Sequence, residues 1–173
     1  DAILVIGSNT TETHPVIGAK IRQAVNRGAK LIVAEPREIP LVEQAEIFMP
    51  LKPGTNVAFL NGLMNVIINE GLMDEEYVKN RTEGFEELWD IVKEYTSEKV
   101  GEICCIDPED LKAAARIYAK ADRAPIFYAM GVTQHSTGTA GVMSIANLAL
   151  LCGKVGKYGC GVNPLRGQNN VQG

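Results

Sequence analysis

The chain has 173 residues, of which 46% are hydrophobic, which is enough apolar material for one core and too little for two. Asp and Glu (21 residues) outnumber Lys and Arg (17 residues), so the net charge of -4 provides no basic field to attract nucleic acid. No apolar run is as long as a membrane span, and no charged-then-apolar leader opens the chain. We therefore expect one soluble domain over residues 1–173, without nucleic-acid binding or membrane insertion. We expect it in the cytoplasm, with export of a longer parent protein as the alternative.

The cysteines and the first residue add two expectations. No two of the four cysteines form a C-x-x-C pair, so we assign no metal ligand to this chain and expect reduced, mostly buried thiols at Cys104, Cys105, Cys152 and Cys160. A strand follows Asp1 at once, with no initiating Met. This start suggests a segment of a longer polypeptide, and a processed mature protein is the alternative.

The first third of the chain has the pattern of a β-α-β unit. Residues 2–7 are a continuous apolar run ending in glycine, which is typical of a strand buried on both faces of a parallel sheet. Thr13 or His14 can then cap a helix that opens with proline and is closed by glycine at position 28. Residues 31–34 form a second short buried strand.

The middle of the chain is mostly helical. A third short strand over residues 47–51 leads through a Lys-Pro-Gly turn into a helix that runs from position 55 to about position 70. Asp74, Thr82 and Asp107 each stand where a helix N-cap is expected. These helices are interpreted as scaffold rather than as parts of a site.

The last third contains a strand, a helix and a polar terminal loop. Residues 125–129 form a fourth strand, and the helix over residues 139–151 is apolar nearly all round, so we expect it to be the most buried helix. Residues 160–173 have neither strand nor helix period, and they carry Arg166 together with five side-chain amides, Asn163, Gln168, Asn169, Asn170 and Gln172. Such groups are costly to desolvate without a polar ligand, so we expect an ordered loop facing an anion, with a solvated tail as the alternative.

Strands that alternate with helices predict an α/β fold, a Rossmann-like open and mostly parallel sheet flanked by helices. Ligands of such sheets bind outside the carboxyl ends of the strands, where helix N-termini offer unpaired N–H groups. We therefore expect one crevice to be formed by residues 8–9, 35–37, 53–56 and 131–134. All four segments are polar or glycine-rich.

Residue types suggest roles within this crevice. Glu35 is placed like an acid that accepts ribose hydroxyls, and Arg37 can meet a phosphate or stack on a base. Gly54 and Gly131 allow a ligand to approach the backbone, with Asn56 at a helix N-terminus. The alternatives are a surface salt bridge and ordinary turn glycines. A G-x-G-x-x-G fingerprint is absent after the first strand, which disfavours a nicotinamide-dependent dehydrogenase.

The two histidines have no neighbouring Cys or carboxylate that would form a visible nucleophilic pair. His14 lies between a possible cap residue and a proline, which indicates a structural role in the turn. For His135 we favour a hydrogen-bonding role.

Motifs along the whole chain resemble those of one enzyme family. They are I-G-S-N at residues 6–9 with His14-Pro15, E-P-R at 35–37, L-K-P-G-T-N at 51–56, R-T-E-G-F at 81–85, Y-A-M-G-V-T-Q at 128–134 and G-K-V-G-K-Y-G-C-G-V-N-P-L-R-G-Q-N-N-V-Q-G at 153–173. The shorter motifs resemble the molybdopterin oxidoreductase family at large. V-N-P-L-R-G-Q-N-N-V-Q-G resembles the catalytic subunit of molybdenum- or tungsten-dependent formate dehydrogenase.

The resemblance implies that this chain is one α/β domain of a larger enzyme with two molybdopterin guanine dinucleotides around one Mo or W. By analogy, one dinucleotide is bound through its guanosine and phosphates by Asn9, Glu35, Arg37, Gly54 and Asn56, and along its pterin side by Met130, Gly131, Gln134 and Gln168. Many family members have Asp in place of Glu35 and of Asn56. The longer carboxylate still reaches a ribose or guanine edge, whereas Asn56 keeps a hydrogen bond but not a charge.

The resemblance also assigns the chemistry. Arg166 matches the arginine that holds formate beside the metal, and a planar guanidinium suits both oxygens of a small carboxylate. The metal's Cys or selenocysteine ligand, its neighbouring His and a [4Fe-4S] cluster belong upstream of Asp1, and electron-transfer subunits are possible partners. The isolated chain is therefore expected to be inactive. Another molybdopterin oxidoreductase and a non-catalytic nucleotide-binding module are the alternatives.

Overall fold

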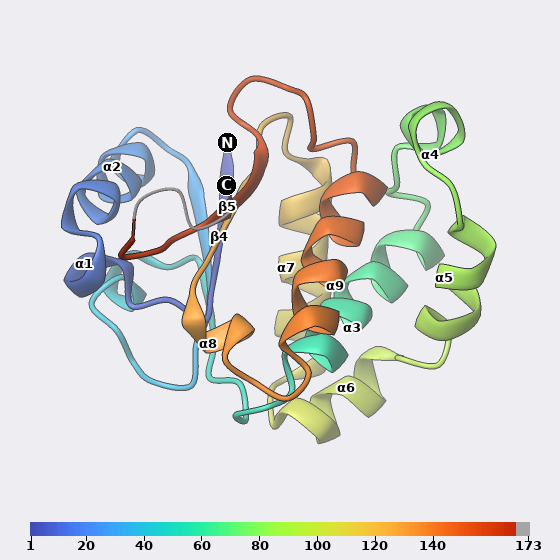
Figure 1. Ribbon diagram of the computed structural model, residues 1–173, viewed down its shortest axis with the longest axis horizontal. Coiled ribbons are helices and arrows are strands. Elements are labelled where there is room, and N and C mark those ends of the chain that lie inside the picture. The colour runs from blue at the N-terminus through green and yellow to red at the C-terminus, as the bar shows by residue number, and fades with distance from the viewer. Residues whose placement is uncertain (169–173) are drawn as a thin grey trace.

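The computed structural model describes residues 1–168, which form a five-stranded, fully parallel sheet in the order β3-β2-β1-β4-β5. The strands are β1 (Ala2–Ile6), β2 (Lys30–Ala34), β3 (Ile47–Met49), β4 (Pro125–Tyr128) and β5 (Gly161–Pro164). The expected α/β fold with an open parallel sheet is confirmed (Figure 1). β5 is a departure, because it lies where the sequence pattern predicted a loop.

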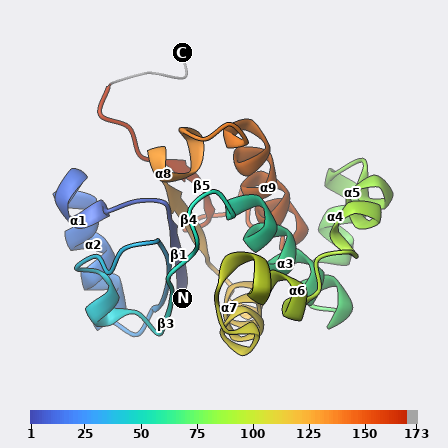
Figure 2. The same ribbon diagram turned by 90° about the horizontal axis from the view of Figure 1, so that it is seen from below.

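Helices cover both faces of the sheet (Figures 1 and 2). On one face lie α1 (Thr10–Thr13) and α2 (Pro15–Asn26), and η1 (Val42–Gln44) is a short 3-10 turn before β3. The remaining helices are α3 (Asn56–Asn69), α4 (Glu75–Arg81), α5 (Phe85–Val92), α6 (Ser97–Cys104), α7 (Pro108–Lys120), α8 (Met130–Thr133) and α9 (Gly138–Leu151). Within residues 1–168, no helix is long and apolar enough to cross a lipid bilayer.

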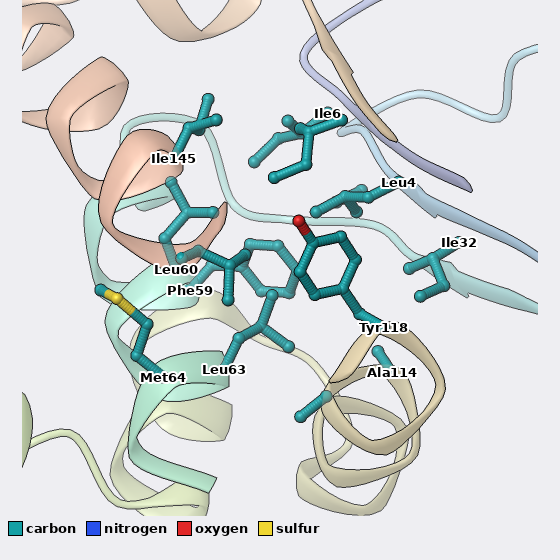
Figure 3. Close-up of a cluster of buried hydrophobic side chains, with 14 of the residues drawn as sticks. Leu4, Ile6, Ile32, Phe59, Leu60, Leu63, Met64, Ala114, Tyr118 and Ile145 are labelled. Carbon is teal, nitrogen blue, oxygen red and sulfur yellow. The ribbon is translucent and has the colours of Figure 1, made fainter. Parts of the chain in front are cut away.

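The alternation of side chains along the strands divides the core into two layers. Ile3, Val5, Leu31 and Val33 point toward α2 and pack with Ile21. The opposite side chains, among them Leu4, Ile6 and Ile32, pack against α3, α7 and α9 (Figure 3). Because both faces are covered, the strands read as continuous apolar runs, and this explains why they were visible in the sequence.

The larger layer is centred on α3 rather than on α9. Helix α3 has nine buried residues, from Phe59 to Ile67, whereas α9 has seven. The expectation that α9 is the most buried helix is therefore wrong. Helix α9 lies at the flank of the layer and exposes 61% of Met143, while α3 is enclosed by α6, α7 and α9. Apolar composition indicated burial but could not rank the two helices.

Helix starts were predicted well where a side chain caps the backbone. Asp74 and Asp107 are N-caps and accept hydrogen bonds from Tyr77 N and Glu109 N. The N-cap predicted at Thr82 was wrong, because Thr82 ends α4. The N-cap of α5 is Gly84, which adopts a left-handed conformation.

The cysteines only partly match the expected mostly buried thiols. Cys104 and Cys152 are buried, Cys105 is exposed, Cys160 is intermediate, and all four are free thiols. Cys105 becomes exposed because it ends α6 in a left-handed conformation.

Candidate cofactor and substrate site

The strand order places a topological switch point between β1 and β4. The chain after β1 continues into α1 and α2 on one face of the sheet, and the chain after β4 continues into α8 and α9 on the other. Segments that leave neighbouring strand ends in opposite directions open a crevice at the carboxyl edge, which is the usual ligand position in such sheets. Asn9 follows β1 and Gly131 follows β4, so both border this point.

The two segments touch through their glycines. Gly131 N donates to Gly7 O at 3.1 Å, and a Cβ added to Gly131 would lie 2.6 Å from that oxygen. Gly7 itself has a φ of +59°, which favours glycine. The Asn56 side chain donates to Gly131 O at 3.1 Å. The structure therefore brings together the segments that follow β1, β3 and β4.

Glu35 follows β2 and is a buried acid at the same edge. Only 8% of the residue is exposed, and this burial raises the pKa of its carboxyl group. The Arg37 guanidinium and the backbone N–H groups of Arg37 and Ser8 act in the opposite direction on that pKa. The Arg37 Nε lies 3.9 Å from a Glu35 oxygen and its side chain is 74% exposed, so this ion pair is weak. Glu35 thus remains a strong acceptor for a ligand's hydroxyl or N–H group.

The turn before α3 presents a helix N-terminus to the crevice. Gly54 has a φ of +88°, and no atom of the described residues lies within 4 Å of a Cβ built on it, so the backbone is accessible there. The Thr55 hydroxyl donates to Lys52 O at 2.7 Å and does not cap the helix, although Thr55 is the N-cap residue. The first N–H groups of a helix lack internal partners, and they suit an anion.

The terminal arm, residues 165–168, continues from β5 across this edge. Leu165 N donates to Tyr128 O at 2.8 Å, and the Arg166 guanidinium lies 5.5 Å from the centre of the Tyr128 ring. Its Nη1 donates to Leu165 O at 3.1 Å, and the Arg166 carbonyl lies 3.0 Å from His14 Nε2. The arm passes from β5 toward α1 (Figure 1).

Three residues of the predicted site are exposed, and one amide of the predicted loop is bonded within the sheet. Met130 is 54% exposed and begins the short helix α8. Gln134 is the exposed residue that ends α8, and Gln168 is also exposed. The Asn163 amide does not face a ligand, because its nitrogen donates to Ile126 O and Gly161 O within the sheet. The amides of Asn169, Asn170 and Gln172 lie outside the described residues.

Sequence reasoning missed three contributors to this edge. Tyr128 supports the Arg166 guanidinium, and the V-N-P of the terminal motif is a strand. The third is the contact between Arg166 and His14, for which a structural role in the turn was predicted but no partner 152 positions away. The Tyr-Ala-Met-Gly stretch gave a hint of the first, since it places an aromatic residue at the carboxyl end of a strand.

A hollow of about 520 Å³ lies elsewhere, lined by residues such as Asp1, Gly28, Arg123 and Gly159. These residues surround the amino ends of β1 and β4. We therefore assign no ligand to this hollow, because the helix N-termini and the polar strand ends are at the opposite edge.

The comparisons with known proteins define the class. A family model described as molybdopterin oxidoreductase matches residues 1–173, so the chain belongs to the molybdopterin oxidoreductase family. It is 52% identical over its whole length to the F420-dependent formate dehydrogenase subunit alpha of Methanocaldococcus jannaschii, of which it covers 26%. It is 38% identical to a nitrate reductase of Symbiobacterium thermophilum, of which it covers 24%.

A solved structure shows the same fold. Acetylene hydratase from Pelobacter acetylenicus superimposes with a TM-score of 0.84 and 36% identity over 88% of this chain and 21% of that chain. This chain thus spans about a quarter of the length of the relatives it matches. The names of these relatives differ in substrate, so fold and family do not fix the reaction.

The family implies a molybdopterin cofactor with Mo or W, and the carboxyl edge fits such a group. A buried carboxylate with a raised pKa, an exposed guanidinium and a helix N-terminus without a side-chain cap form a complementary set for a nucleotide with phosphates. Gly54 leaves the backbone accessible beside them, whereas Gly131 is exposed but packs closely against Gly7.

Proposed function

We propose that this chain is part of a formate dehydrogenase catalytic subunit and binds one of two molybdopterin guanine dinucleotides. Identity to a formate dehydrogenase subunit is 52%, against 38% to a nitrate reductase. The observation that carries the proposal is Arg166, a half-buried guanidinium beside the switch point, on an arm that β5 and Tyr128 support. Other domains of the subunit would supply the metal ligand and a [4Fe-4S] cluster, and electron-transfer subunits would take the electrons.

Each end of the dinucleotide would have its own partners on this edge. Glu35 would accept hydroxyl or N–H groups of the guanosine, and Arg37 and the N-terminus of α3 beyond Gly54 would bind phosphates. The other contacts of this end would be Asn9 and Asn56, and those of the pterin end would be Met130, Gly131, Gln134 and Gln168. The four residues proposed for the pterin end are all exposed, which is consistent with contact to a large ligand.

Arg166 would act on the substrate. Formate is a planar monoanion, and a guanidinium that stays charged at any working pH can hold both oxygens through two parallel hydrogen bonds. This grip fixes the direction of the C–H bond. The bound cofactor would supply the two-electron redox chemistry that converts formate into carbon dioxide, a proton and two electrons.

The substitution Arg166→Lys tests this role in the complete, cofactor-loaded enzyme. Lys keeps the charge but lacks the two-pronged geometry, so the KM for formate should rise roughly ten- to a hundredfold, the worth of one charge-assisted hydrogen bond. Turnover should also fall. The matched control is Arg116→Lys, because Arg116, which lies on α7 and away from the site, makes a two-pronged ion pair with Glu70 at the end of α3. Unchanged formate kinetics in Arg166→Lys would refute the assignment.

Nitrate reduction is the second candidate, because a nitrate reductase matches at 38% identity and nitrate is also a planar monoanion. Assays of the same enzyme with formate and a dye acceptor, and with nitrate and a dye donor, separate the two activities. Formate-dependent dye reduction without nitrate turnover supports the proposal. Nitrate turnover without formate oxidation would replace it.

A further inference from the structure

His14 bridges the two halves of the switch point, and the proposed function leaves it without a role. It lies between α1 and α2, at the C-cap of the first and the N-cap of the second, and its side chain caps neither helix. Its Nε2 instead lies 3.0 Å from the carbonyl oxygen of Arg166. Its Nδ1 lies 2.9 Å from the Thr13 hydroxyl, which donates to Asn9 O at 3.0 Å.

These contacts fix which ring nitrogen carries a proton. A carbonyl oxygen can only accept, so His14 Nε2 must be the donor to Arg166. The Thr13 hydroxyl has one proton and two neighbours. It can donate to Asn9 O and accept from a protonated Nδ1, or it can turn and donate to an unprotonated Nδ1. The bond from Nε2 to Arg166 is therefore kept in both charge states of the ring.

The bond acts on the backbone from which the substrate-binding side chain extends. On the β4 side, the arm is held by the bond from Leu165 N to Tyr128 O, and the guanidinium lies over the Tyr128 ring. On the opposite side of the switch point, the partner is His14 at the start of α2. Two rigid elements thus hold consecutive residues of the arm from both sides.

We infer that His14 is a positioning residue, which holds the Arg166 backbone through its Nε2–H group and so places the guanidinium for the anionic substrate. This inference rests on the proposed role of Arg166. It assigns no contact between His14 and the substrate or the cofactor.

Three variants of the complete enzyme test the inference. His14→Leu removes the donor, His14→Gln restores an N–H donor at similar reach, and Lys20→Ala changes an exposed residue of α2 as a control. In the cofactor-loaded enzyme, His14→Leu should raise the KM for formate about two- to tenfold, the worth of one neutral hydrogen bond, with pterin and metal content retained. His14→Gln should restore most of the affinity, which a purely structural loss would not show.

Trypsin provides a readout that does not depend on activity. The carbonyl that His14 binds belongs to the Arg166–Gly167 peptide bond, which trypsin can cleave. In the cofactor-free protein, this bond should be cut several times faster in His14→Leu than in the wild type, His14→Gln or Lys20→Ala. If His14→Leu does not fold, Thr13→Val replaces it, because it removes the partner that holds Nδ1 and lets the ring turn away from the Arg166 carbonyl. The Nε2 donor remains in that variant, so a smaller increase in cleavage is expected.

The outcomes are distinguishable from a failure of the proposed function. A wild-type enzyme that does not oxidise formate contradicts the proposed function, and the cleavage rates still judge the contact between His14 and Arg166. Equal cleavage in all variants overturns the inference. So does a His14→Gln enzyme with the same formate KM as His14→Leu, because the restored donor would then have no effect.

Discussion

Glu35 is the residue whose burial has the clearest energetic cost. It is nearly enclosed at the end of β2, and its nearest cation is exposed and 3.9 Å away. A buried carboxylate with such a weak partner destabilises the fold when it is charged. A bound ligand that donates hydrogen bonds would compensate this cost, and this supports Glu35 as a binding residue rather than as one half of a stabilising salt bridge.

The raised pKa of Glu35 gives a pH dependence with a definite sign. From the unperturbed value of 4.5 upward to the raised value, the native state binds more protons than the unfolded state, so the free energy of unfolding decreases as pH rises through this window. Glu35→Gln should remove that decrease and make the cofactor-free protein more stable at pH 7.

Urea unfolding from pH 4.5 to pH 8 measures the effect, and the exposed acid Glu12, changed to Gln, controls for the loss of one negative charge. In the loaded enzyme, the same Glu35 variant should retain less cofactor. A lower stability of Glu35→Gln at pH 7 would contradict the cost assigned to the buried charge.

At the scale of elements, the close approach of the segments after β1 and β4 is the constraint that shapes the crevice. Gly131→Ala would place a Cβ 2.6 Å from Gly7 O and 2.7 Å from Gly7 Cα, and neither backbone atom can give way alone. We expect a loss of about 1–3 kcal/mol in the free energy of unfolding, the usual cost of overpacking. Denaturant unfolding measures it, and Gly167→Ala, whose Cβ meets no atom of residues 1–168 within 4 Å, should cost much less.

The elements that were predicted from sequence are those whose signals are local. Asp74 and Asp107 cap their helices through their own side chains, and β1 is an uninterrupted apolar run. β5 could not be seen, because Gly161 and Pro164 disfavour strands and the segment becomes one only by pairing with β4. Helix α6 was missed although it has a local signal, because the Thr96 side chain accepts a hydrogen bond from Lys99 N at its start. It is short, and it packs on α3 and α7.

For the whole molecule, the sequence predicted the parallel sheet and the edge at which strand ends converge. It could not predict contacts between residues far apart in the chain. The bond from His14 to Arg166 and the packing of Gly7 against Gly131 depend on the order of the strands, and no local pattern encodes that order. The site residues on the arm were assigned by resemblance, and their ligand contacts remain predictions.

The two-layered core leads to a prediction for the chain as a unit. Because residues of both sheet faces are enclosed by helices of the same chain, residues 1–173 should fold without cofactor and unfold cooperatively in urea. The same preparation should show no formate-dependent dye reduction, since the proposed metal ligand and cluster lie in other domains. Formate-dependent reduction of a dye by this chain would contradict the proposal that other domains supply the metal ligand and the cluster.

The register between β4 and β5 determines where the chain can tolerate changes in length. Tyr128 pairs with Pro164, and Leu165 is the one residue between that pair and Arg166. Inserting a residue here would turn the guanidinium to the opposite side, because side chains alternate along an extended chain. The glycine-rich connection from 153 to 160 precedes Gly161, the first residue of β5 that pairs with β4. Natural variation in length should therefore concentrate in this connection and spare residues 161–166.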